Sequence, residues 1–248
     1  MVKLIVGGAT GFVASEIIRQ SLANPKVTAI YALARKPVAV PEGTAPGADT
    51  SKLKSLVVKD FEAYPEDVKA QLADADGAIW ALAILPQKTR GMPFEEVKKI
   101  NQTYTLAALK QIEEARAAKG QKGTFRFLYI SGPDTPRTPD GPTPPVFKEY
   151  IRLKGRIEVD CLEFAEKHRA SGWETAAAKP GLVMPNPPGL LMTVVGAVAG
   201  LIAGKIGIRE LAAAMVDQVS NGFEKEPLEN VDLARIGKTT LDKQQVGP

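Results

Sequence analysis

Tyr150 and Lys154 form the residue pair in this sequence with the clearest capacity for chemistry. They lie four residues apart in a segment with helical periodicity, so we expect both side chains on one face of a helix. A cation beside a phenol favours the phenolate and lowers the phenol pKa from about 10. Tyr150 could then donate or accept a proton near neutral pH. Ser131 ends an expected strand and could hydrogen-bond a substrate carbonyl.

A glycine turn near the N-terminus is the second motif. The apolar run at residues 2–6 is typical of a buried parallel strand, and a helical pattern follows the turn. Such a turn lets backbone N–H groups approach a pyrophosphate at the positive end of the helix dipole. We therefore expect a dinucleotide here, and a glycine-rich turn without a ligand is the alternative. The expected contacts are Gly8, Thr10, Gly11, Phe12 and Val13.

The end of the second expected strand indicates which nicotinamide cofactor binds. NAD sites usually place a carboxylate there, whereas an arginine accommodates the 2′-phosphate of NADP. This chain has Arg35 and Lys36 and no acid, which predicts NADP(H). The alternative is a pair of solvated charges at a strand end.

Two further strand ends could contact the cofactor. Asp60 could accept a hydrogen bond from the adenine amino group, and Phe61 could flank the adenine ring. The equally weighted alternative is that Asp60 is an ordinary loop residue and Phe61 is part of the hydrophobic core. Ala81 and Leu82 would let the backbone lie against the cofactor, although a tightly packed strand end needs the same small residues.

Strands and helices alternate along the chain, which predicts an α/β doubly wound parallel sheet, the Rossmann fold. We expect a single domain over residues 1–248, with 181–210 as a substrate-side insertion or lid. The expected strands are 3–6, 27–34, 55–59, 77–83, 125–130, 173–179 and a short one near 231–236. The expected helices are 14–22, 65–72, 93–120, 147–170 and 209–222.

Composition excludes several functions. The 32 Lys and Arg residues are scattered among 28 Asp and Glu residues, which argues against nucleic-acid binding. Cys161 is the one cysteine, so no intrachain disulfide forms and a reducing, cytoplasmic location fits. His168 is the one histidine, and no Cys/His cluster has metal-ligand spacing, so we expect no metal. The N-terminus enters a strand directly, without the pattern of a signal peptide.

The segment Leu190–Gly204 contains no charged residue. Its length of about 15 residues falls short of the roughly 20 that span a bilayer. We expect an apolar wall over the substrate site or a contact in a homodimer, and no membrane span; peripheral membrane contact stays open.

Together these motifs resemble the short-chain dehydrogenase/reductase superfamily in its extended or atypical branch, including Tip30-like and fungal nucleoside-sugar epimerase-like proteins. The resemblance implies that Ser131, Tyr150 and Lys154 form the active site, that Asn101 supports Lys154 through water, and that Pro180 adjoins the cofactor. Two positions depart from the pattern. Ala14 replaces the third glycine, and Lys179 stands where relatives usually carry arginine.

These observations predict an NADP(H)-dependent oxidoreductase that acts on a small or medium apolar carbonyl or alcohol. The substrate is expected between the loop 133–145 and the segment 185–204. Two alternatives stay open. The chain could be a non-redox isomerase, epimerase or cyclase that retains the dinucleotide, or a regulatory protein that senses the cofactor.

Overall fold

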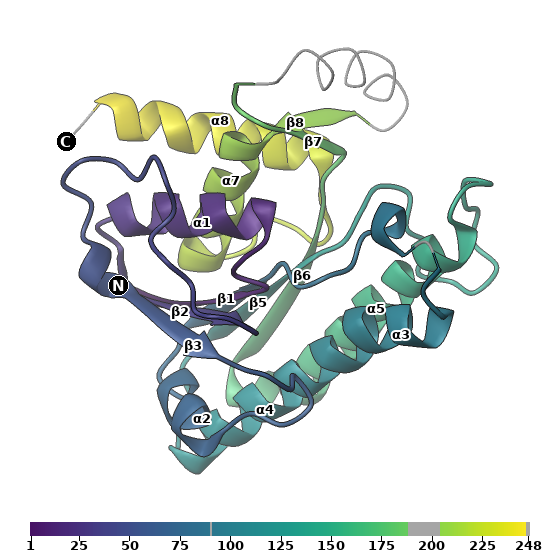
Figure 1. Ribbon diagram of the computed structural model, residues 1–248, viewed down its shortest axis with the longest axis horizontal. Helices are drawn as coiled ribbons and strands as arrows, with labels where there is room; N and C mark the ends of the chain where they lie inside the picture. Colours follow the sequence, from purple (N-terminus) through teal and green to yellow (C-terminus); the bar gives the residue numbers. More distant parts are fainter. Residues whose placement is uncertain (90, 188–203, 247–248) are drawn as a thin grey trace.

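A seven-stranded parallel sheet forms the centre of the protein (Figure 1). The computed structural model describes residues 1–89, 91–187 and 204–246. The strand order is β3-β2-β1-β4-β5-β6-β9, so the predicted doubly wound sheet is confirmed. The strands are β1 (Val2–Gly7), β2 (Val27–Ala34), β3 (Leu53–Val57), β4 (Gly77–Trp80), β5 (Phe125–Ile130), β6 (Trp173–Lys179) and β9 (Leu228–Glu229); β7 (Leu182–Met184) and β8 (Lys205–Gly207) form a separate pair.

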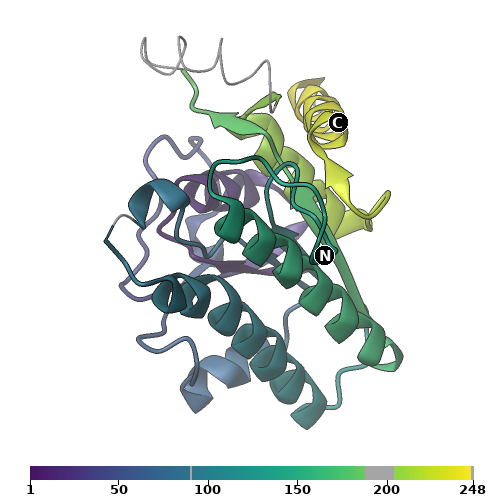
Figure 2. The same cartoon turned by 90° about the vertical axis from the view of Figure 1, so that its right-hand side faces the viewer.

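Helices cover both faces of the sheet (Figure 1). One face carries α1 (Phe12–Ala23), α7 (Ile208–Asn221) and α8 (Asn230–Val246). Their buried apolar side chains, which include Ile17, Leu211 and Leu233, belong to one hydrophobic cluster. The other face carries α2 (Glu66–Leu72), α3 (Phe94–Lys98), α4 (Tyr104–Ala118) and α5 (Lys148–Lys167) over a second cluster. Figures 1 and 2 show α4 and α5 side by side. Short turns lie at η1 (Thr50–Lys52), η2 (Pro86–Lys88), η3 (Lys99–Thr103) and η4 (Arg169–Ser171).

Three expectations need correction. The strand expected near 231–236 is wrong, because α8 covers these residues and the strand is β9 just before them. Leu233 and Ile236 are both buried and lie three residues apart, the spacing of one helix face. The helix expected over 93–120 is interrupted by η3, a π-helical turn. The strand expected to reach residue 83 ends at Trp80.

The apolar segment Leu190–Gly204 lies outside the described residues except for Gly204. Its expected role therefore stays a prediction. Among the described helices, none combines the length and the hydrophobicity that a membrane span requires.

Candidate functional site

The glycine turn lies against the backbone that leaves β4. Gly8 has φ +73°, and a Cβ there would come within 2.7 Å of the Leu82 Cα. The Ala81 N–H donates a 3.0 Å hydrogen bond to the Gly7 carbonyl, which holds the two strand ends together. Only glycine fits between them, because a side chain would displace main-chain atoms. The turn thus sits where the order of strands reverses, the position at which open α/β sheets bind ligands.

The N-terminus of α1 opens from this turn. Gly11 caps the helix without a side-chain hydrogen bond, and its N–H donates to the Gly8 carbonyl at 2.9 Å. Thr10 is exposed, Phe12 is 55% exposed and Val13 is half-buried. The first N–H groups of a helix have no intrahelical acceptor. An anion at this turn would therefore meet unsatisfied donors and the positive end of the dipole.

Arg35 and Lys36 follow directly after β2, and both side chains are exposed. Within the described part of the chain, neither is joined to a carboxylate by an ion pair. The strand register pairs Gly7 with Leu33, so both cations leave the sheet beside the glycine turn. Two cations at this edge fit a phosphorylated cofactor.

Asp60 and Phe61 have different surroundings after β3. Asp60 is exposed and its Oδ1 accepts the Glu62 N–H at 2.9 Å. Phe61 is 2% exposed, with its ring centroid 6.2 Å from that of Trp80. The ring therefore has the core position that the sequence left open as the alternative to a place beside adenine.

Tyr150, Lys154 and Glu158 occupy successive turns of α5. Lys154 Nζ donates a 2.7 Å hydrogen bond to the Ile130 carbonyl at the end of β5 and lies 4.2 Å from the Tyr129 ring centroid. Burial lowers the pKa of Lys154 to about 7, and the charge of Glu158 opposes that shift. A buried lysine next to a strand end can hold a ribose hydroxyl or a tyrosine, as the resemblance implies.

Tyr150 is half-buried and lines a pocket formed by the start of α5 and residues 86–97. Burial raises the pKa of its phenol to about 12. The expectation that Lys154 lowers this pKa is therefore corrected, because Lys154 Nζ is turned to the Ile130 carbonyl in this structure. As it stands, Tyr150 keeps its proton at neutral pH.

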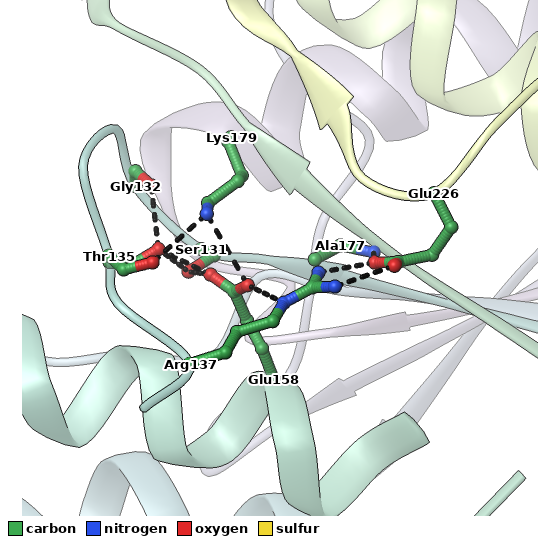
Figure 3. Close-up of polar contacts among 8 residues, drawn as sticks. All are labelled: Ser131, Gly132, Thr135, Arg137, Glu158, Ala177, Lys179 and Glu226. Atoms are coloured by element: carbon green, nitrogen blue, oxygen red, sulfur yellow. Dashed lines mark hydrogen bonds and ion pairs between the residues drawn. The ribbon is translucent and has the colours of Figure 1, made fainter. Parts of the chain in front are cut away.

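Glu158 is the centre of a buried polar network (Figure 3). Its side chain is fully buried, and its Oε1 accepts hydrogen bonds from the hydroxyl of Ser131 and, at 2.5 Å, from that of Thr135. Lys179 Nζ lies 3.6 Å from Oε2 and donates to the Thr135 carbonyl at 3.1 Å. Lys179 thus provides the cation that the resemblance expects from arginine at this position.

Arg137 extends the network to the C-terminal part of the chain (Figure 3). Its Nε donates to Glu158 Oε2 at 2.8 Å, and its two terminal nitrogens hold Glu226 at 2.7 and 2.5 Å. Glu226 also accepts the Ala177 N–H at 3.3 Å. These pairs raise the pKa of Arg137, so a fixed cation joins the loop 133–145, α5 and the segment before β9.

Gly155 allows the loop to reach α5. A Cβ at Gly155 would lie 1.8 Å from the Pro136 carbonyl oxygen. Because Gly155 has no side chain, the loop lies close to α5, and Arg137 reaches Glu158, which lies one helical turn after Gly155.

Asn101 and Pro180 are the remaining expected site residues. Asn101 is buried in the π-helical turn, and its Nδ2 donates to the carbonyls of Val97 at 2.9 Å and Ile84 at 3.4 Å. Its Oδ1 is buried without a partner among the described residues, so it is free to accept a hydrogen bond. Pro180 is buried directly after β6.

The sequence analysis missed Thr135, Arg137 and Glu226 as members of the site. Glu158 carried a weak signal, because its spacing of four from Lys154 puts both on one face of α5. Arg137 and Glu226 are 89 residues apart, a distance that no local pattern can signal. Within the described residues, no cluster of His, Cys, Asp and Glu could hold a metal ion.

Sequence comparisons are sparse. No family model matches the chain. A curated protein of Purpureocillium lilacinum, the leucinostatins biosynthesis cluster protein T, is 27% identical over 127 residues, which are 51% of this chain and 42% of the relative. The match thus spans less than half of that protein's length.

Structural comparisons are extensive. The PhqB reductase domain of Penicillium fellutanum superposes with a TM-score of 0.67 and 16% identity, covering 92% of this chain and 66% of that domain. A Burkholderia cenocepacia short-chain dehydrogenase in complex with NADP has a TM-score of 0.63 and 13% identity, covering 99% and 95%. The chain therefore shares its α/β fold with these proteins. MoeE5 in complex with UDP-glucuronic acid and NAD has the same fold, with a TM-score of 0.66, 16% identity and coverage of 98% of this chain and 82% of that chain.

Proposed function

We propose that the chain is an NADP(H)-dependent oxidoreductase of the extended or atypical short-chain dehydrogenase/reductase branch, acting on a small or medium apolar carbonyl or alcohol. The observation that carries the proposal is the cradle at Gly8, which a Cβ would fill by contact with Leu82 at 2.7 Å. The open N-terminus of α1 and the two exposed cations after β2 complete a site that fits a dinucleotide with a 2′-phosphate.

Each side chain of the proposed site has a distinct role. Bound NADPH would supply a hydride. Tyr150 would give its phenolic proton to the substrate oxygen, a role for which a phenol protonated at neutral pH is suited. Lys154 would break its hydrogen bond to the Ile130 carbonyl and donate to the ribose and to Tyr150. Ser131 would orient the substrate oxygen.

A specific observation supports the alternative functions. The Ser131 hydroxyl donates to Glu158, so Ser131 must rearrange before it can orient a substrate oxygen. A non-redox isomerase, epimerase or cyclase, or a protein that senses the cofactor, would leave this hydroxyl where it is. A dTDP-glucose 4,6-dehydratase and a UDP-N-acetylglucosamine 4-epimerase are among the structural neighbours, which is compatible with the first of these functions.

The organisation of the whole protein is part of the proposal. We propose one domain with residues 181–210 on the substrate side, a cytoplasmic location and no metal. A homodimer is compatible with this reading.

Fluorescence titration of the full chain with NADPH and NADH tests the cofactor site. Turnover of NADPH with a panel of apolar ketones then separates an oxidoreductase from the alternatives. Cofactor binding without turnover by any ketone or alcohol would favour the non-redox or sensing function. Failure to bind either dinucleotide would exclude the whole proposal.

A further inference from the structure

A pocket of about 310 Å³ lies beside Tyr150, where the start of α5 meets the chain that follows β4. Its volume is at the lower end of the range for small-molecule sites. Its described lining residues are mostly apolar, and the polar Thr89 hydroxyl already donates to the Pro86 carbonyl at 2.8 Å. The lining comprises Pro86, Thr89, Met92, Phe94, Val97 and residues 147–150.

Exposed apolar side chains gather on the two segments that form this pocket. Phe94 is 39% exposed and Phe147 is 48% exposed, and both line it. Leu85, which is 53% exposed, precedes the lining residue Pro86, and Val146, which is 59% exposed, precedes Phe147. Water-exposed apolar side chains concentrated in one place are typical of a surface that binds an apolar ligand.

The backbone at Phe147 supports the same reading. Phe147 has φ 58° and ψ 31°, a left-handed conformation that non-glycine residues rarely adopt. Such conformations cost of order 1–3 kcal/mol and are found preferentially at functional sites. This conformation immediately precedes α5 and accompanies a phenyl ring at the pocket.

The pocket also adjoins the expected cofactor site. Leu82 packs under Gly8 in the glycine turn, and Pro86, four residues later, already lines the pocket. Four extended residues reach at most about 14 Å, so the pocket that Tyr150 lines begins within that distance of the backbone beneath the glycine turn.

We propose that this pocket binds the ring portion of an uncharged carbonyl or alcohol compound of one or two rings, with Phe94 and Phe147 as its specificity-determining walls. The inference rests on the proposed oxidoreductase function and names the substrate class for that site. The apolar side chains that line the pocket favour an uncharged ligand.

This location differs from the one expected from the sequence. The sequence analysis placed the substrate against the loop 133–145 and the segment 185–204, of which 188–203 lie outside the described residues. A pocket is also present at that loop, lined by residues 134–136 and 142–144, so the expected location stays a prediction. The pocket beside Tyr150 is a separate one, between α5 and the chain that leads into α3.

Prodan, a neutral two-ring aromatic ketone whose emission shifts to the blue in apolar surroundings, is a suitable probe. We expect the full-length protein to bind one equivalent of prodan. Phe94→Ala and Phe147→Ala should each weaken binding by about tenfold, because each removes an aromatic wall. Val40→Ala provides the matched control, since Val40 is 42% exposed and does not line the pocket. It should bind prodan as the wild type does.

The outcomes separate this inference from the proposed function. Thermal unfolding and NADPH titration of each variant test whether it is correctly folded. Tyr150→Phe should retain prodan binding while losing turnover. Prodan binding without any NADPH turnover would leave the pocket in place and contradict the oxidoreductase function. Equal prodan affinity in all variants, no binding by the folded wild type, or displacement of prodan by UDP-glucose would overturn the inference.

Discussion

Ser131 donates its hydroxyl proton to Glu158, although the two residues are 27 positions apart; Ser131 directly follows β5, and Glu158 lies on α5. One turn earlier on the same helix, Lys154 binds the carbonyl of Ile130, the residue before Ser131. The helix therefore holds the end of β5 at two adjacent positions. Arg137 and Lys179 both pair with the buried Glu158 carboxylate, so charge pairs hold this part of the site together.

Glu158→Gln should destabilise the protein by about 3 kcal/mol, because it leaves Lys179 buried with reduced compensation and weakens the contact to Arg137. For a chain of this size we expect the melting temperature to fall by roughly 6–12 °C. Glu166→Gln, on the exposed side of the same helix, should change stability by less than about 0.5 kcal/mol. Calorimetry of both variants provides the measurement, and equal melting temperatures would show that the buried network contributes little.

Local pattern was sufficient to predict the strands from β1 to β6 but not β9. The expected bounds of β2, β5 and β6 match the structure because their apolar runs are buried from both faces by helices. The glycine turn could be predicted for a similar reason, since its signal is contained in a few consecutive residues.

The network around Glu158 could not be predicted, because its energy comes from contacts between distant segments. Arg137 lies in a proline-rich loop, and its partner Glu226 lies in an irregular segment before β9. Neither residue belongs to a periodic element that would signal its position. The pKa of Tyr150 was expected to be lowered, whereas burial raises it. The sequence shows the spacing of Tyr150 from Lys154 but not the burial of either side chain, so the direction of the shift could not be predicted.

Replacing Arg35 and Lys36 together by Ala should weaken NADPH binding at least about tenfold and leave NADH binding nearly unchanged. Both side chains are exposed at the end of β2, so the change should not disturb folding. Lys110→Ala, at an exposed position on α4, is the charge-matched control for one lost cation. Isothermal titration with both cofactors measures the effect, and a wild-type protein that prefers NADH would contradict the proposed specificity.

Tyr150→Phe should reduce turnover by roughly a hundred- to ten-thousandfold while leaving NADPH affinity nearly unchanged. The phenol acts only on the substrate oxygen in the proposed reaction. Lys154→Ala should impair both quantities, because Lys154 is assigned to the tyrosine and the ribose together. Steady-state rates and cofactor titrations of the two variants test this division of roles. Normal turnover by Tyr150→Phe would favour the alternative functions.

Gly155→Ala should loosen the loop 133–145, because its Cβ would lie 1.8 Å from the Pro136 carbonyl oxygen. Hydrogen exchange in that loop should become faster, and the contact between Arg137 and Glu158 should weaken. Gly123→Ala is the control, since a Cβ there meets no atom within 4 Å. If both variants show wild-type exchange in the loop, the close packing at Gly155 does not hold the loop in place.

Stability should depend on pH through Lys154. Its pKa is lowered to about 7 in the folded protein by burial, against about 10.5 when unfolded. Between these values the unfolded chain binds a proton that the folded protein lacks, so the stability rises with pH. The slope is at most about 1.4 kcal/mol per pH unit. Below pH 7 both states are protonated and this dependence disappears.

Urea unfolding of the cofactor-free protein at pH 7.5, 8.0 and 8.5 measures this dependence. The same series on Lys154→Met provides the reference, because Met is unbranched and only one atom shorter than Lys and lacks the titrating amine. We expect the wild-type free energy of unfolding to rise by about 1 kcal/mol over this range relative to the variant. Burial raises the pKa of Cys161 and Tyr150 in both proteins, so their contributions cancel in the difference. A difference that stays constant with pH would mean that Lys154 remains charged in the folded state.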